Sequence, residues 1–109
     1  GPQGSLASTN YPRGIEIGVN WSTDLLQHLW ANDLHYAEAT EAAEKRWTDH
    51  VVKMYSVMLM RKAQSWFTGY NSNVDGHEAG KVRYFVYNGG TPKYVATINE
   101  VAENGYEEL

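Results

Sequence analysis

The feature that most constrains the fold of this chain is a single strand-like run at residues 82–87. β-Branched and aromatic residues fill the run, except for Arg83, and an Asn-Gly-Gly turn follows it. Since no second run of this kind occurs, a sheet cannot close within the chain. Backbone N–H and C=O groups that are buried without partners are costly. We therefore predict that this strand belongs to a sheet outside these residues, as part of a larger body.

Three stretches with helical periodicity make the rest of the chain mainly helical, so the predicted class is α+β. We expect helices at about 12–31, 40–62 and 92–104. A long polar loop separates the second helix from the strand, at 65–81. Thr9 or Asn10 is expected to cap the first helix, and Thr91 the last. The first helix carries an apolar stripe formed by Ile15, Val19, Ser22, Leu26, Leu29 and Trp30.

The chain is short and acidic, and this argues against several classes of function. Its 109 residues include 13 acidic and 9 basic side chains, for a net charge of −4, and no cysteine. The basic residues cluster only as pairs, so we expect no nucleic-acid partner. The longest apolar run is about four residues against the ~20 that span a bilayer, and no leader pattern opens the chain. The sequence therefore predicts a cytoplasmic protein without a membrane partner.

No catalytic or metal-binding motif can be recognised in the sequence. The four histidines lack the i,i+4 spacing of a helical metal site, and neither GxGxxG nor GxxxxGK[ST] is present. Trp66, where the long loop begins, is the best candidate for contact with the ring of a ligand. From the residues alone, anchoring the loop to the core is the simpler role for Trp66. Three acidic residues suit the start of a helix better than catalysis: Glu38, Glu41 and Glu44.

Several blocks of sequence carry a resemblance to a known family: Ser65 to Asn71 (SWFTGYN), Gly80-Lys81, Tyr87 to Tyr94 (YNGGTPKY) and Glu100 to Glu107 (EVAENGYE). In this order and spacing they resemble the C-terminal end of Baeyer–Villiger monooxygenases, class B flavoproteins that use FAD and NADPH. Residues 72–79 look like an insertion. Gly1 to Ser5 and Val19-Asn20-Trp21 are similar to the turn and last helix of the family's FAD-binding domain. This register favours Gly1 as native sequence over a tag remnant.

The resemblance implies the C-terminal segment of a flavoprotein with two dinucleotide-binding domains. Residues 1–31 would end the FAD-binding domain, and residues 32–109 would form a C-terminal segment with an NADP-contacting loop at 65–81. The complete enzyme would use FAD and NADPH to insert one oxygen atom of O2 into ketones, which gives esters or lactones. The family's nucleotide-binding motifs and active-site arginine are absent from this chain. The isolated chain is therefore expected to be inactive, with no catalytic residue and no metal ligand of its own.

The resemblance implies three groups of site residues. Trp66 would contact NADP, and Asn10 and Tyr11 would face the flavin edge from a helix start, where backbone N–H groups stabilise negative charge. The pocket for the ketone would be lined by Leu6, Ala7 and Ser8.

The expected partner is the remainder of the flavoenzyme, its FAD and NADP domains. Four large side chains are expected to pack against that body: Trp21, Trp47, Tyr84 and Tyr94. An alternative is a non-catalytic interaction module derived from the family, with the strand at 82–87 pairing with a partner chain.

Overall fold

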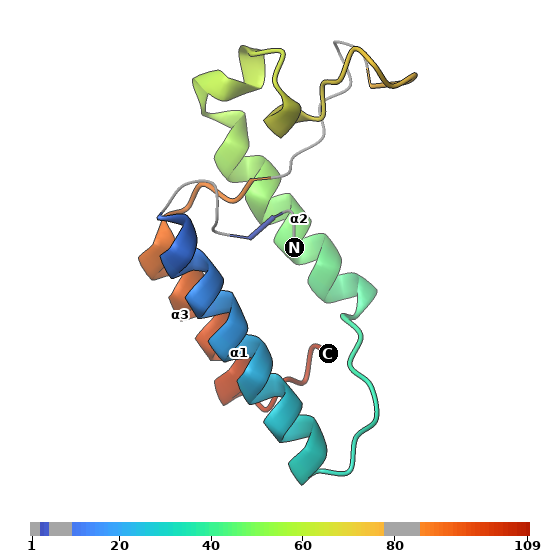
Figure 1. Ribbon diagram of the computed structural model, residues 1–109, viewed down its shortest axis with the longest axis vertical. Helices are drawn as coiled ribbons and strands as arrows, with labels where there is room; N and C mark the ends of the chain where they lie inside the picture. Colours follow the sequence, from blue (N-terminus) through green and yellow to red (C-terminus); the bar gives the residue numbers. More distant parts are fainter. Residues whose placement is uncertain (1–2, 5–9, 78–85) are drawn as a thin grey trace.

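The computed structural model describes residues 3–4, 10–77 and 86–109. In this part of the chain there are three α-helices and no strand (Figure 1). The helices are α1 (Tyr11–Ala31), α2 (Glu41–Ser56) and α3 (Thr91–Glu103). Two short 3-10 turns follow α2, namely η2 (Leu59–Lys62) and η3 (Trp66–Thr68). The prediction of a mainly helical chain with three helices is confirmed.

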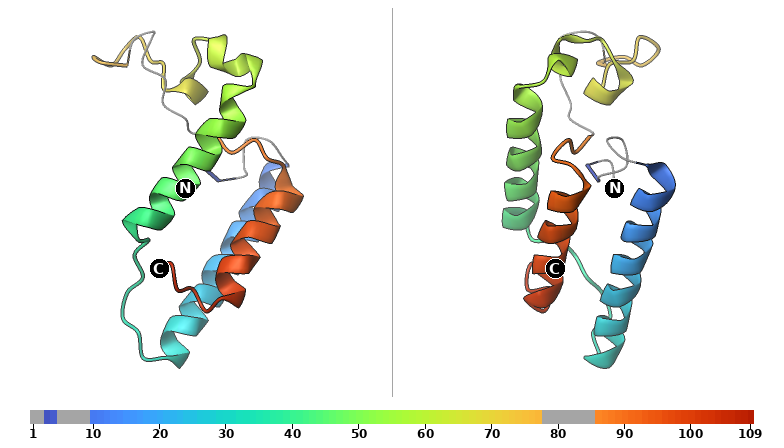
Figure 2. Two further views of the ribbon diagram at one scale, coloured as in Figure 1. Left: turned by 180° about the vertical axis from the view of Figure 1, so that it is seen from behind. Right: turned by 90° about the vertical axis from the view of Figure 1, so that its left-hand side faces the viewer.

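The helices form a pair and a separate third member. Helices α1 and α3 lie side by side and run in the same direction, whereas α2 runs the opposite way (Figures 1 and 2). The molecule is elongated, with principal extents of 47 × 27 × 23 Å. None of the helices described is long and apolar enough to cross a membrane.

Helix α1 begins where its cap and its proline predict. The Asn10 side chain accepts a hydrogen bond from the Arg13 backbone N–H at 3.2 Å, so Asn10 is the N-cap. Pro12 follows in the first turn, where a missing N–H costs nothing. Trp21 joins α1 to α3, because its indole N–H donates to the Ile98 carbonyl at 2.7 Å. Thr9 lies outside the described residues.

The predicted helix at 40–62 is wrong at its C-terminal end. Thr40 is the N-cap, but the helix stops at Ser56 and Met58 is extended before η2 begins. The Ser56 hydroxyl donates to the Lys53 carbonyl at 2.7 Å, a local bond that competes with helix continuation. Val57 and Leu59 are both more than 80% exposed. Helical periodicity continued past Ser56, but Met58 and Met60 are only half-buried there and Val57 and Leu59 are exposed, so little packing stabilises another turn.

The predicted strand at 82–87 lies mostly outside the described residues. Its last two positions, Val86 and Tyr87, are buried but not in strand conformation. Helix α3 then starts at Thr91, which is inside the helix rather than its cap as predicted. Gly90 occupies the cap position with φ of 83°, a left-handed conformation that glycine adopts without strain, and offers no side chain to the helix N–H groups.

Aromatic side chains fill the space between α2 and α3. Trp47 of α2 stacks on Tyr87 with ring centroids 5.1 Å apart and an interplanar angle of 16°. Tyr94 of α3 meets Trp47 at 6.0 Å and Tyr87 at 5.5 Å. Trp47 and Tyr94 therefore have partners within the chain, as Trp21 does, and all three are half-buried. That they also pack against a body outside the chain stays a prediction. Tyr84 lies outside the described residues.

Burial also favours the neutral form of the two tyrosines in this cluster. Desolvation raises the pKa of Tyr87, and the neighbouring Tyr94 adds to the effect. Desolvation likewise raises the pKa of Tyr94. A raised pKa favours the neutral phenol, so both hydroxyls keep their proton to a higher pH than an ordinary tyrosine does.

The C-terminal tail joins the α1–α3 pair to α2. Tyr106 is buried against Trp21 and His28 of α1, with ring centroids at 5.5 and 4.9 Å. Two residues later, the Glu108 carbonyl accepts from the Thr40 backbone N–H at 3.0 Å. The Glu108 carboxylate also pairs with the Arg46 guanidinium. This tail therefore adds a backbone hydrogen bond and an ion pair to the aromatic contacts between α2 and α3.

Replacing Gly89 by alanine is expected to lower the free energy of unfolding by about 1–3 kcal/mol, the usual cost of overpacking. A Cβ at this position would overlap the Tyr87 phenol ring and lie 2.9 Å from Met54 Sδ. Gly18→Ala is the matched control, because no atom lies within 4 Å of its Cβ position apart from its chain neighbours and the backbone of its own helix. In a helix, that change stabilises by up to about 1 kcal/mol. Thermal unfolding followed by circular dichroism should separate the two variants, and equal melting temperatures would contradict the packing described.

Candidate functional site

The turn at η3 presents Trp66 to solvent. Trp66 is 71% exposed, and its ring touches Phe67 edge to face, with centroids 5.6 Å apart. No described residue accepts a hydrogen bond from its indole N–H. The alternative that Trp66 anchors the loop to the core is therefore not what this structure shows. A large ring with an available N–H donor suits contact with a polar, ring-bearing ligand.

A reciprocal capping box holds this turn. The Ser65 side chain accepts from the Phe67 N–H at 3.3 Å, and the Thr68 hydroxyl accepts from the Ser65 N–H at 3.3 Å. Gly69 ends the turn with φ of 79°. Trp66 was predicted as a site residue but this pair was not, because the sequence signature of a capping box has Glu or Gln three residues after the Ser, and here that residue is Thr68.

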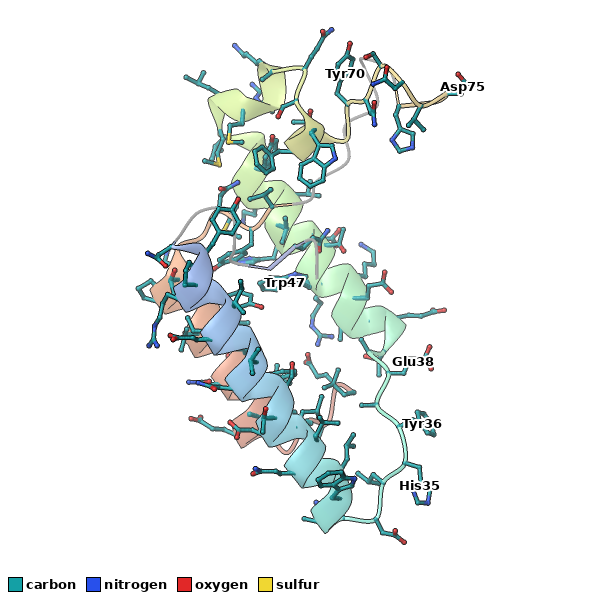
Figure 3. The ribbon with its side chains drawn as sticks, in the orientation of Figure 1. His35, Tyr36, Glu38, Trp47, Tyr70 and Asp75 are labelled. Atoms are coloured by element: carbon teal, nitrogen blue, oxygen red, sulfur yellow. The ribbon has the colours of Figure 1, made fainter. Side chains whose placement is uncertain are left out.

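The described part of the predicted loop, residues 65–77, is ordered by its own backbone. Beyond η3, the Asn71 N–H donates to the His77 carbonyl at 2.8 Å, and the Asn71 side chain accepts from the Asn73 N–H at 2.9 Å. Residues 78–81 lie outside the described residues. Figure 3 places Tyr70 and Asp75 at one end of the molecule, far from His35 and Tyr36 in the linker after α1.

The start of α1, which is predicted to face the flavin edge, offers fewer free backbone N–H donors than an uncapped helix start. The Asn10 side chain is already used to cap the Arg13 N–H, and Pro12 has no N–H. The Gly14 N–H donates to the Asn10 carbonyl at 3.0 Å. The Tyr11 N–H is the donor of this turn for which no described residue is an acceptor. An anion at this end would therefore depend on the Tyr11 N–H and the positive end of the helix dipole for its binding. No acidic residue lies in the first turn to repel it.

The candidate positions lie on separate elements. Trp66 lies beyond the end of α2, whereas Asn10 and Tyr11 lie at the start of α1 (Figures 1 and 2). The predicted pocket residues Leu6, Ala7 and Ser8 lie outside the described residues. Within the residues described, no three His, Asp or Glu side chains gather as a metal site.

Helix α1 has an apolar face apart from the side packed toward α3, and it carries four residues of the apolar stripe predicted from the sequence: Ile15, Val19, Leu26 and Trp30. At about 100° per residue, the side packed toward α3 is centred on Trp21, and polar residues centred on Asn20 occupy another third of the circumference. The remaining third is mainly apolar, and five of its side chains are between 53% and 81% exposed. Its members, here called the α1 stripe, are Tyr11, Ile15, Val19, Leu26 and Trp30.

Comparisons with known proteins give a consistent set of relatives. Cyclohexanone 1,2-monooxygenase from Acinetobacter is 34% identical over 107 residues, which is 98% of this chain and 18% of that protein. A protein named Baeyer-Villiger monooxygenase, from Pseudooceanicola batsensis, is 30% identical over 109 residues, 100% of this chain and 19% of its own length. FAD-binding monooxygenase VdtE from Byssochlamys spectabilis is 27% identical over 99% of this chain and 18% of its own length.

No protein-family profile matches the chain. The similarity therefore rests on these pairwise matches, which cover nearly all of this chain. In contrast, the chain spans only about 18% of the length of these relatives. What is similar is one segment of a much longer enzyme.

Proposed function

Because this chain is distantly homologous to Baeyer–Villiger and other FAD-binding monooxygenases, we propose that it acts as one segment of such an enzyme. The complete protein would use FAD and NADPH to insert one oxygen atom of O2 into a ketone, giving an ester or lactone. This segment would shape the flavin edge, part of the ketone pocket and an NADP-contacting loop. Residues 1–31 would complete the FAD-binding domain, and residues 32–109 would follow it as a C-terminal segment.

The α1 stripe is the observation that carries this proposal. Five large apolar side chains in line on one helix, each more than half exposed, are unusual for a surface exposed to water. A helix that is apolar on two of its three sides is typical of one buried between two layers. The remaining four-fifths of an enzyme of the relatives' length would supply the second layer. The FAD and NADP domains are therefore the proposed partner.

The described residues fit the two cofactors in different ways. Trp66 would donate its indole N–H to a ribose hydroxyl of NADP and lay its ring against the nucleotide. At the flavin edge, the Tyr11 N–H and the positive end of α1 would face the pyrimidine ring, while the Asn10 side chain keeps the helix start in place. When bound, FAD supplies the redox chemistry and NADPH the hydride. Leu6, Ala7 and Ser8 remain proposed pocket residues.

Comparison of the isolated chain with the complete protein tests the proposal. The complete protein should retain FAD, consume NADPH in a ketone-dependent manner and release an ester, whereas the 109-residue chain should be colourless and inactive. Turnover by the isolated chain, or a complete protein without flavin, would contradict it. The alternative of a non-catalytic interaction module would gain support if the chain is naturally separate and runs as a well-folded monomer in size-exclusion chromatography with light scattering.

In the complete enzyme, Trp66→Ala is expected to weaken NADP⁺ binding and raise the KM for NADPH by about tenfold, equivalent to about 1.4 kcal/mol. The change removes one hydrogen bond and one ring contact. Trp66→Phe keeps a ring and should recover part of the loss. Val74→Ala, in the same exposed loop, is the control. Titration with NADP⁺ and steady-state kinetics provide the measurements, and wild-type values for Trp66→Ala would remove Trp66 from the site.

A further inference from the structure

We propose that Ser65 and Thr68 are positioning residues that set the direction of Trp66 for nucleotide binding. The inference rests on the proposed role of Trp66 and adds the device that orients it. Both residues act through the backbone of η3, without contact to the nucleotide.

Thr68 is the structural centre of the turn. It is 4% exposed, a low value for a hydroxyl residue in a loop at the end of the molecule. Its Oγ1 donates toward the Ser65 carbonyl at 2.7 Å, with the Ala63 carbonyl at 3.2 Å, and accepts from the Ser65 N–H at 3.3 Å. The hydroxyl therefore uses both its donor and its acceptor capacity to close the turn on which Trp66 lies.

Trp66 has little else to fix its direction. Its ring is mostly exposed, and Phe67 is the described aromatic side chain that it touches. Backbone bonds continue the turn on either side: the Thr68 N–H donates to the Ser65 carbonyl at 2.8 Å and the Gly69 N–H to the Trp66 carbonyl at 3.0 Å. The direction in which the Trp66 side chain leaves the turn is consequently set by the backbone conformation at 65–69, and the Ser65–Thr68 pair stabilises that conformation.

Pre-organisation converts this stabilisation into affinity. When only a fraction of the protein has the binding-competent turn, the apparent Kd rises by the inverse of that fraction. Thr68→Val keeps the shape of the buried side chain but removes both functions of the hydroxyl. We expect the Kd for NADP⁺ to rise about fivefold in this variant, which corresponds to a fall of the binding-competent fraction to about one fifth of its wild-type value. Thr68→Ser restores the hydroxyl and should return the Kd to within about twofold of wild type.

The experiment uses the complete FAD-containing enzyme and measures the Kd for NADP⁺ by isothermal titration calorimetry. Hydrogen–deuterium exchange of the peptide covering residues 65–71 gives a second readout, which needs no nucleotide and should speed up in Thr68→Val. Thr97→Val is the matched control, since the Thr97 hydroxyl donates to the Lys93 carbonyl within α3, away from this turn. FAD content and kcat should stay near wild type while the KM for NADPH rises.

The outcomes separate this inference from the proposed function. Unchanged Kd in Thr68→Val, together with a raised Kd in Trp66→Ala, would overturn the positioning role and leave the proposed function standing. Unchanged Kd in Trp66→Ala would instead remove the NADP role of Trp66 and this inference with it. If Thr68→Val loses FAD and fails to fold, Ser65→Ala decides, because it removes the cap on the Phe67 N–H from the other half of the pair. Wild-type affinity in that variant would overturn the proposal.

Discussion

Tyr106→Ala is expected to lower the free energy of unfolding by about 3 kcal/mol or more, the cost of removing a large ring from a core. Tyr106 is 8% exposed and fills the contact between Trp21 and His28 of α1. Without the ring, the tail loses the contact that holds it on α1. Glu108 is then no longer held in place for its bonds to Thr40 and Arg46. For a chain of this size the loss corresponds to a fall in melting temperature of at least about 10 °C.

The conservative variant separates the ring from the hydroxyl. Tyr106→Phe keeps the packing and should cost less than about 1 kcal/mol. Burial, together with the nearby Asp24 carboxylate, raises the pKa of Tyr106. A raised pKa means that the folded state favours the neutral phenol, so stability is complete below the ordinary value of 10.0 and falls as the pH rises above it. Tyr106→Phe should reduce this alkaline loss.

Thermal unfolding by circular dichroism, at neutral pH and at pH values above the ordinary tyrosine pKa, gives the measurement for both variants. Tyr106 also has φ of 59°, a conformation that is uncommon for any residue other than glycine. Alanine and tyrosine are similarly unfavourable there, so the difference in stability between them reports the loss of the ring. A melting temperature for Tyr106→Ala within about 3 °C of wild type would show that the tail is not a structural joint.

Local signals in the sequence were sufficient to locate the helices. The caps at Asn10 and Thr40 use side chains that bond three residues ahead, and such bonds depend only on neighbouring residues. The same local reasoning failed where burial decides. The periodic pattern continues past Ser56, but whether Val57 and Leu59 meet a partner depends on elements far away in the sequence. Thr91 is a good cap residue by type, but Gly90 takes the cap position of α3, because the turn before the helix requires a backbone with positive φ there.

In the candidate site, too, some features could be predicted from the sequence and others could not. Trp66 could be identified as a candidate because its sequence block resembles a family, and its exposure agrees with a ligand contact. The support from Thr68 needs coordinates, since its hydroxyl reaches back as far as Ala63. The contact between the C-terminal tail and α2 could not be predicted, because Arg46 and Glu108, which bond to one another, are 62 positions apart in the sequence. No periodicity or spacing rule carries information over that separation.

The α1 stripe gives the second large effect, and it should differ between the isolated chain and the complete enzyme. Val19→Glu places a charge at a position that is 57% exposed in this structure. In the isolated chain the change should alter the free energy of unfolding by less than about 0.5 kcal/mol, as is usual for surface positions. In the complete enzyme, where we propose that this face is covered, an unpaired buried carboxylate should cost several kcal/mol.

Asn20→Glu is the matched control, because Asn20 is the next residue after Val19, lies on the polar side of α1 and is exposed. The measurements are the melting temperature and the FAD content of the complete enzyme, set beside the melting of the isolated chain. Loss of FAD and a fall in melting temperature confined to Val19→Glu in the complete enzyme would establish the stripe as an internal surface. If Val19→Glu and Asn20→Glu behave alike there, the stripe faces solvent, and the proposed packing of α1 between two layers is wrong.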